Sequence, residues 1–202
     1  GKCNPLEVLF PQGELSSLEG LYKDSMMAMI PNQLFRNAIK MILAQLPQDR
    51  TLRILELGAG TGGTTAHIVK DLPADRIDYV YTDISNLFLE KARDKFRKYP
   101  FLRYELLDIE QNPEQLGFSP HQFDVVFASN VLHATVDLRR SVGNAIRLLS
   151  PGGLLCLIEG VRPTGWIDLI FGQLDGWWRF GDTELRPSYP LLSIEKWKWL
   201  LE

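Results

Sequence analysis

The sequence predicts an α/β fold in which a mostly parallel sheet carries helices on both faces. Between residues 52 and 159, five short apolar segments typical of buried strands alternate with segments of helical periodicity. Strands that alternate with helices of this length form a parallel sheet through right-handed crossovers. The 202 residues, 45% of them hydrophobic and 23% charged, fit one folded domain of this kind rather than a disordered chain.

The elements are predicted in order from the periodicity of the apolar residues. The first is a helix over residues 21–46, interrupted at Pro31, whose later part has the spacing of one buried face. The residues on that face are Leu34, Phe35, Ala38, Met41, Ile42 and Leu46. Strands are then predicted at residues 52–57, 79–84, 102–107, 123–128 and 154–159, and helices at 64–72, 87–99 and 136–149. In the second of these helices we expect Leu87, Ala92 and Phe96 to face inward and the basic residues to face the solvent.

Composition narrows the function classes. The net charge of −3 and the pI near 5.7 give no basic footprint, so no nucleic-acid partner is expected. No apolar run approaches the roughly 20 residues of a membrane-spanning helix, so no membrane partner is expected either. The two cysteines, Cys3 and Cys156, form no CxxC pair. We therefore expect no metal site and no disulfide framework, and a reducing cytoplasm is the default location.

The residues after the first strand predict a binding loop. In parallel sheets ligands bind outside the carboxyl ends of the strands, and the run from Glu56 to Gly63 lies at such an end. Gly58, Gly60 and Gly63 have the spacing of a dinucleotide fingerprint. The Glu56 carboxylate, however, would repel a pyrophosphate and attract a cation. The run therefore favours a cationic, phosphate-free cofactor such as S-adenosylmethionine, with a glycine turn that binds no ligand as the alternative.

This run resembles motif I of the class I S-adenosylmethionine-dependent methyltransferases, which have a Rossmann-like fold. A carboxylate at Asp83, after the second strand, can accept hydrogen bonds from both ribose hydroxyls, and Ile84 offers an apolar face to a purine. Asp108 and Ile109 follow the third strand, where the adenine amino group is expected. The resemblance implies these roles for the acidic residues. The alternative for each aspartate is a cap on the next helix.

A histidine and a glutamate follow the fourth and fifth strands. These two strands should be neighbours, about 4.8 Å apart, so His133 and Glu159 are expected to converge on one side of the cofactor pocket. A histidine oriented by a carboxylate is a general base whose charged form is stabilised. Asn130, three residues earlier, is assigned to the cofactor site. A packing role at the start of a helix is the alternative for His133.

The wider sequence resembles methyltransferase domains embedded in polyketide synthases. The segments that carry this resemblance are residues 4–11, 21–25, 127–135, 149–153, 158–159, 176–180, 182, 186–187 and 190–193. In the carbon-methylating members, the residues that match His133 and Glu159 form the catalytic pair. The resemblance implies an acyl substrate linked by phosphopantetheine to an acyl carrier protein, with neighbouring synthase domains as further partners.

The resemblance also implies a division of the chain into two parts. The sequence departs from the family pattern at two points. Residues 1–50 are assigned to an N-terminal linker and helical lid segment, and residues 51–202 to the S-adenosylmethionine-binding core. Ser25-Met26 stands where family members often have Ser-Pro. A class I sheet has seven strands and only five are predicted here, so the last two strands are expected to be absent from this chain and the core to be incomplete at its C-terminal side.

The expected reaction is methylation of the α-carbon of a β-ketoacyl thioester, because that carbon lies between two carbonyls and a histidine can deprotonate it. Tyr22, Trp177 and Trp178 are assigned to the substrate, with core packing as the alternative for the tryptophan segment. Arg179 and Arg186 either meet a phosphopantetheine phosphate or form structural salt bridges. Two other functions stay open: O-methylation of a carrier-bound β-hydroxyl, and a non-catalytic structural domain.

Overall fold

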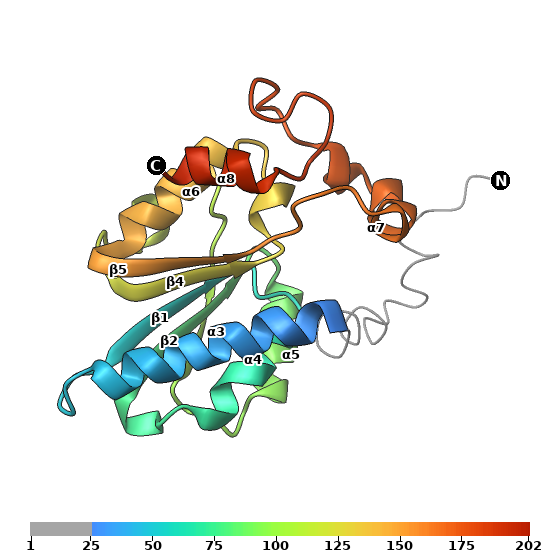
Figure 1. Cartoon of the computed structure of the whole chain (residues 1–202). Coiled ribbons are helices and arrows are strands. Elements are labelled where there is room, and N and C mark those ends of the chain that lie inside the picture. Colours follow the sequence, from blue (N-terminus) through green and yellow to red (C-terminus); the bar gives the residue numbers. More distant parts are fainter. Residues whose placement is uncertain (1–25) are drawn as a thin grey trace.

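In a computed structural model of the protein, residues 26–202 are described, and they are built on one five-stranded sheet (Figure 1). The strands are β1 (Leu52–Leu57), β2 (Ile77–Asp83), β3 (Leu102–Leu106), β4 (Phe123–Ser129) and β5 (Leu149–Ile158). Their order in the sheet is β3-β2-β1-β4-β5, and every neighbouring pair is parallel. The prediction of a parallel α/β fold with five strands is confirmed for this part of the chain.

The helices cover both faces of the sheet. They are α3 (Met26–Gln45), α4 (Gly63–Ile68), α5 (Asn86–Lys95), α6 (Leu138–Leu148), α7 (Gly165–Ile170) and α8 (Ile194–Leu201). Figure 1 shows α3, α4 and α5 on one face, and α6 and α8 on the other. The helices α7 and α8 were not predicted from the sequence. No helix within residues 26–202 is long and apolar enough to cross a membrane.

Two apolar clusters form the core, one on each face of the sheet. Phe35 and Ile39 of α3 pack in the first cluster with α4, α5 and the side chains of β1 and β2 that point to that face. Leu138 and Val142 of α6 pack in the second, together with Trp197 of α8. Side chains of β1 alternate between the two clusters, because successive residues of a strand point to opposite faces. The helix of the segment assigned to residues 1–50 is thus part of the same core.

The prediction for the first helix is wrong about the interruption at Pro31 and about part of the buried face. α3 runs through Pro31 without interruption, although an interior proline is unfavourable in a helix, and packing of Phe35 and Ile39 in the core stabilises the turns after it. Leu34 and Met41 were expected on the buried face but are 65% and 64% exposed. The buried stripe instead follows Phe35, Ile39 and Leu43 at four-residue spacing.

Ala92 of α5 and Phe96, directly after the helix, are buried as predicted, but Leu87 in the first turn is 55% exposed. Leu89 takes the inward position there. The fifth strand also begins earlier than predicted, at Leu149, which pairs with Phe123 before a register shift. Gly152, with φ of +75°, lies in this irregular stretch, which the sequence pattern marked only as the end of a helix.

Candidate active site

Two adjoining cavities lie at the carboxyl ends of the strands. The smaller, of about 180 Å³, is lined by the glycine loop after β1 together with Glu56, Thr64 and Phe88. The larger, of about 910 Å³, lies between α3 and the segment that follows β5. Ser129 and Asn130 at the end of β4 line both cavities. The site therefore has two compartments that meet at the end of one strand, in the part of the sheet where a ligand was expected.

The loop after β1 forms the wall of the smaller cavity. Gly58 and Gly60 both have positive φ, of 56° and 57°. A side chain at Gly58 would also place its Cβ 2.6 Å from Val131 Cγ1, so the position excludes any larger residue. The Ala59 amide donates to the Thr82 carbonyl over 2.8 Å, which holds the loop against the end of β2. The tight turn predicted for the glycines is present, and the binding of a ligand against its backbone stays a prediction.

Glu56 is a buried carboxylate at the base of this loop. Its side chain is 2% exposed, and Oε2 accepts hydrogen bonds from Thr65 Oγ1 over 2.5 Å and from the Tyr79 hydroxyl over 2.6 Å. Burial, with a smaller contribution from the negative charge of Asp83, raises the pKa of Glu56 to about 7 against the hydrogen bonds from Thr65 and Tyr79, which lower it. The ionised form is therefore costly, and a cation bound in the cavity would stabilise it.

Asp83 links the glycine loop to the end of β2. Oδ2 accepts from the Gly60 amide over 2.8 Å, and Oδ1 accepts from the Ser85 amide over 2.9 Å. Burial raises the pKa of Asp83 above its ordinary value, although these backbone donors oppose the rise. Each carboxylate oxygen keeps capacity for a further donor. Asp83 does not line the smaller cavity but lies directly behind the Gly60 amide, and the neighbouring Ile84 is 64% exposed.

The structure places Asp108 and Ile109 away from both cavities. Asp108 accepts from the Glu110 amide and from Gln111 Nε2, each over 3.0 Å, so it closes a turn after β3. The side chain of Ile109 was expected beside the cofactor, but it is 6% exposed and packs in the core on the α6 face. Its carbonyl accepts from Asn144 Nδ2 over 2.8 Å. Asp108 keeps its assigned role only as a prediction, and the Ile109 side chain has a core role instead.

His133 and Glu159 are brought together as predicted. Asn130, with φ of +55°, turns the chain after β4, and its amide donates to the Ile158 carbonyl over 2.7 Å. This contact places the turn beside the end of β5, so His133 Nδ1 lies 2.6 Å from Glu159 Oε2. The side chains of His133 and Glu159 are 10% and 4% exposed.

Glu159 fixes the orientation of the imidazole. Its Oε1 accepts from the amides of Val131 and Leu132, over 3.0 and 2.8 Å, while its Oε2 faces His133 Nδ1. Because a carboxylate accepts and does not donate, Nδ1 carries the proton and the lone pair of the ring lies on Nε2. A carboxylate-oriented imidazole whose Nε2 carries the lone pair has the chemistry of a general base.

The tryptophan segment after β5 lies against the larger cavity. Trp177 is buried, meets the His133 ring edge-on at 5.3 Å and stacks on Phe171 at 5.8 Å. Trp166 and Trp177 line the cavity. Trp178, which was also assigned to the substrate, does not. It is 47% exposed and its indole N–H donates to the Gly172 carbonyl over 2.9 Å. Tyr22 lies outside the described residues.

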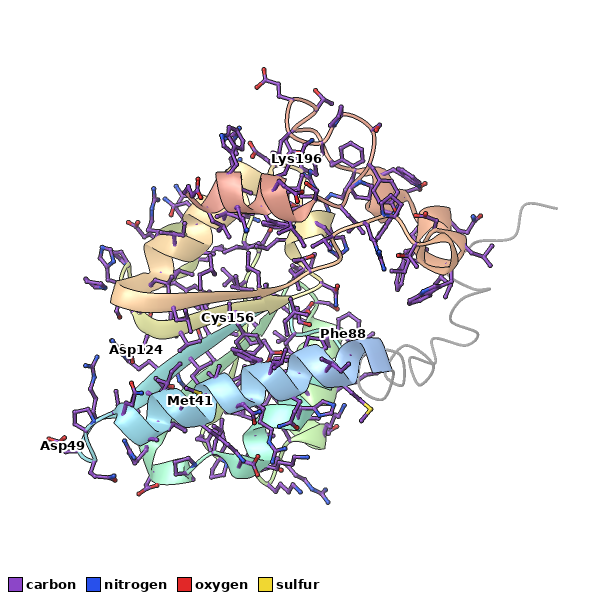
Figure 2. The ribbon with its side chains drawn as sticks, viewed as in Figure 1. Met41, Asp49, Phe88, Asp124, Cys156 and Lys196 are labelled. Carbon is purple, nitrogen blue, oxygen red and sulfur yellow. The ribbon has the colours of Figure 1, made fainter. Side chains whose placement is uncertain are left out.

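Sequence reasoning missed the contribution of α3 to the site. Leu34, Phe35 and Ala38 line the larger cavity, so the exposed Leu34 faces its space rather than the core. Asn32 is buried beside them, and its Oδ1 accepts from Thr64 Oγ1 over 2.9 Å, which connects the walls of the two cavities. The sequence signal that could have revealed this is the apolar pattern of α3, which is wider than the single stripe a helix needs to pack against the core. Phe88 of α5, labelled in Figure 2 near the carboxyl ends of the strands, was also not predicted to line the smaller cavity.

Arg179 and Arg186, in the segment after β5, both form salt bridges. This is the second of the two alternatives predicted for these residues. Arg186 pairs with Asp182 over 2.5 Å, and Arg179 pairs with Glu110 over 2.6 Å. Arg179 also lines the larger cavity, whereas Arg186 is fully buried behind His133.

Comparison with known proteins connects this geometry to a family. Residues 55–155 match the family described as "Methyltransferase domain". The non-reducing polyketide synthase ausA of Emericella nidulans is 41% identical over 189 residues, which are 90% of this chain and 7% of the synthase. The crystal structure of the CurJ carbon methyltransferase is 47% identical, with a TM-score of 0.95, and the match covers 98% of this chain and 53% of that one. The trans-methyltransferase CalH in complex with SAH is 36% identical, with a TM-score of 0.83, over 98% of this chain and 54% of that one.

The chain thus spans about half the length of these solved structures and less than a tenth of the synthase. The matched region contains the end of β1, the glycine loop, the strands β2, β3 and β4, and most of β5. The fold and the sequence matches agree with the Rossmann-like class I fold that was predicted. The chain belongs to the family of S-adenosylmethionine-dependent methyltransferase domains, and within it is homologous to the methyltransferase domains of polyketide synthases.

Proposed function

We propose that this domain transfers a methyl group from S-adenosylmethionine to the α-carbon of a β-ketoacyl thioester. The observation that carries the proposal is the His133–Glu159 pair at the wall of the larger cavity, which adjoins the glycine-loop cavity at Ser129 and Asn130. A methyl donor in one compartment and an acceptor in the other would meet at the end of β4, beside the imidazole. Holding two reactants in this way contributes to catalysis through proximity.

The residues of the smaller cavity fit the cofactor. Glu56 is a buried carboxylate whose ionised form needs a cationic partner, and the glycine loop admits a ligand close to the backbone. Asp83 holds that loop through the Gly60 amide and keeps acceptor capacity for ribose hydroxyls. When bound, S-adenosylmethionine supplies an electrophilic methyl group on a positively charged sulfur. Its charge complements Glu56, and a pyrophosphate in the same place would be repelled.

The reaction needs a base, and we assign that role to His133. The α-proton of a β-ketoacyl thioester is acidified by two carbonyls, so an imidazole can act as the base that removes it. With Nδ1–H donating to Glu159, the proton is taken by Nε2, and the imidazolium that forms is stabilised by the carboxylate at 2.6 Å. The electron pair left on the α-carbon would form the new C–C bond to the methyl group as the S–CH₃ bond breaks, and the released cofactor product would be the neutral thioether S-adenosylhomocysteine. Glu159 is a positioning and charge-stabilising residue in this scheme.

The larger cavity suits an acyl chain. Its walls carry Leu34 and Phe35 of α3, Leu157 of β5, and Trp166 and Leu191 of the segment after β5, so most of the surface is apolar. The relatives of this chain are parts of polyketide synthases, which supports a carrier-bound acyl group as the substrate and an acyl carrier protein and neighbouring synthase domains as partners. Cytoplasmic location is part of the same proposal.

The test separates the proton transfer from the methyl transfer. A β-ketoacyl thioester deuterated at the α-carbon is incubated with the protein without S-adenosylmethionine, and deuterium loss is followed by mass spectrometry. His133→Asn is expected to slow this exchange by about 10²- to 10⁴-fold, the usual contribution of a general base. His121→Asn is the matched control, because His121 contacts the Leu149 carbonyl near the opposite end of the sheet.

The position of the new methyl group completes the test. With S-adenosylmethionine added, fragmentation of the product should place the methyl on the α-carbon of the β-keto substrate. Methylation of a β-hydroxyacyl substrate on oxygen, with the β-keto substrate unchanged, would show that the O-methyltransferase alternative is correct. Failure of the protein to bind S-adenosylmethionine in calorimetry would support a structural domain instead.

A further inference from the structure

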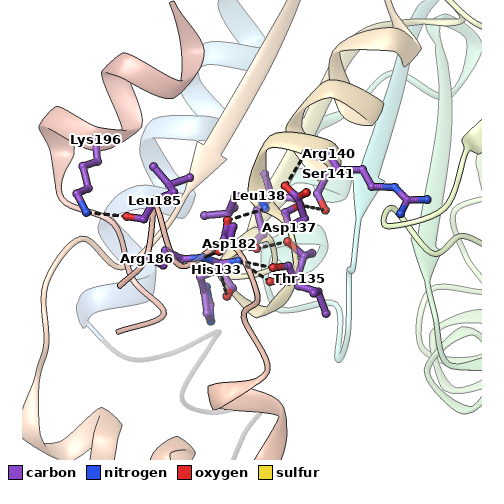
Figure 3. A network of polar contacts seen from close by, with 12 residues as sticks. His133, Thr135, Asp137, Leu138, Arg140, Ser141, Asp182, Leu185, Arg186 and Lys196 are labelled. Carbon is purple, nitrogen blue, oxygen red and sulfur yellow. Dashed lines mark hydrogen bonds and ion pairs between the residues drawn. The ribbon is translucent and has the colours of Figure 1, made fainter. Parts of the chain in front are cut away.

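Arg186 is a fully buried arginine directly behind the turn that carries His133. The residue is 1% exposed, and its guanidinium donates to the carbonyls of three residues of that turn (Figure 3). Nη1 donates to the His133 carbonyl over 2.8 Å, and Nη2 donates to the carbonyls of Thr135 and Val136 over 2.7 and 3.1 Å. Nε donates to Asp182 Oδ1 over 2.5 Å. A planar fork of donors is needed to reach these acceptors at once.

Burial of a charge is unfavourable unless the charge is paired and its donors are satisfied. Asp182 supplies the counter-charge, and its Oδ2 also accepts from the Leu138 amide over 3.0 Å at the first residue of α6. The Asp182–Arg186 pair therefore holds both the carbonyls of the turn and the start of the helix that follows it. These contacts join segments about 50 residues apart in the sequence.

The turn is held from two sides. Glu159 accepts from the amides of Val131 and Leu132 just before His133, and Arg186 donates to the carbonyl of His133 itself and to two carbonyls after it. The peptide of His133 thus lies between a buried anion and a buried cation. The ring of Trp177 packs edge-on against the imidazole. Little freedom is left for the imidazole to leave Glu159.

We infer that Arg186 is a positioning residue for the general base: it fixes the peptide of His133 so that Nδ1 stays on Glu159 and Nε2 stays available to the substrate. The inference rests on the proposed function, because it assumes that His133 is the base. Arg186 itself touches neither the cofactor nor the acyl chain in this scheme, since it lines neither cavity.

Arg186→Lys tests the inference, because lysine keeps the charge but cannot reproduce the fork. The first measurement needs no substrate. It is the NMR signal of the Nδ1 proton of His133, recorded on protein that contains ¹⁵N-labelled histidine. A proton held on a carboxylate over 2.6 Å should resonate at low field in the unaltered protein and be lost or broadened in Arg186→Lys. The second measurement is α-deuterium exchange, which should slow by about 10- to 100-fold, the cost of a small misplacement of a catalytic group. The affinity for S-adenosylmethionine should stay within about twofold.

Arg53→Lys is the matched control. Arg53 donates Nε and Nη2 to Asp124 near the amino end of the sheet, away from the cavities (Figure 2), so both readouts should stay unchanged. If Arg186→Lys does not fold, Asp182→Asn replaces it. Asparagine keeps the size of the side chain but removes the negative charge that pairs with Arg186. Asp182→Asn should therefore weaken the low-field signal of the His133 Nδ1 proton and slow α-deuterium exchange by at least about threefold.

The outcomes separate the two proposals. An unchanged low-field signal together with an unchanged exchange rate in a folded Arg186 or Asp182 variant would overturn the positioning role. An unaltered protein that shows the low-field signal but exchanges no α-deuterium would overturn the base assignment, and loss of the signal in Arg186→Lys would still show that Arg186 positions the ring.

Discussion

Replacement of Glu159 by glutamine is expected to inactivate the base by moving a proton, although the shape of the side chain is kept. Glu159 serves three donors: the amides of Val131 and Leu132 on Oε1 and His133 Nδ1 on Oε2. Glutamine has one oxygen and one NH₂ group. If its NH₂ faced the two amides, two buried donors would lose their acceptor, at about 1–3 kcal/mol each. The oxygen is therefore expected to face the amides and the NH₂ group to face His133.

In that orientation Nδ1 must accept a hydrogen bond, so the ring proton moves to Nε2. The lone pair that should take the α-proton is then no longer on the substrate side of the imidazole. General-base catalysis contributes about 10²- to 10⁴-fold, and in serine proteases the corresponding change of tautomer costs roughly 10⁴-fold. Glu159→Gln should therefore slow α-deuterium exchange about as much as removal of the imidazole does.

The assay is α-deuterium exchange without S-adenosylmethionine, combined with ¹⁵N spectra that report the tautomer of His133. Glu114→Gln, at an exposed ion pair with Arg147, is the control and should leave both unchanged. If Glu159→Gln folds, shows the proton on Nε2 and still exchanges deuterium at the rate of the unaltered protein, His133 is not the base and the proposed mechanism fails.

Two further predictions concern the cofactor cavity. Burial raises the pKa of Glu56 to about 7, and only the ionised form attracts a cation. The affinity for S-adenosylmethionine, measured by calorimetric titration, should therefore fall about tenfold between about pH 8 and pH 6. Glu56→Gln should remove this pH dependence. A pH-independent affinity in the unaltered protein would exclude Glu56 as the partner of the positive charge. Asp83→Ala removes the acceptor that holds the Gly60 amide and is proposed to bind the ribose, so affinity should fall about tenfold or more, each such bond being worth roughly 1.5–3 kcal/mol. An unchanged affinity would remove Asp83 from the site.

Local signals in the sequence determined the fold and the part of the site that follows directly from it. The apolar strands and the helices between them set the parallel sheet. Once the sheet is parallel, the carboxyl ends of its strands lie at one edge, so Glu56, His133 and Glu159 had to lie near each other. The glycine loop was also predictable, because a tight turn with positive φ at Gly58 is a property of a few consecutive residues.

Only the tertiary structure decided which way several side chains face and which distant residues support them. Ile109 follows a strand in the same manner as Ile84, yet its side chain packs in the core, because the turn closed by Asp108 directs it to the α6 face. Leu34 has the spacing of a core residue, yet it faces a cavity whose far wall comes from the segment after β5. Arg186 is an ordinary charged residue in the sequence. Its burial against the His133 turn depends on contacts across about 50 residues, and such contacts leave no periodic pattern along the chain.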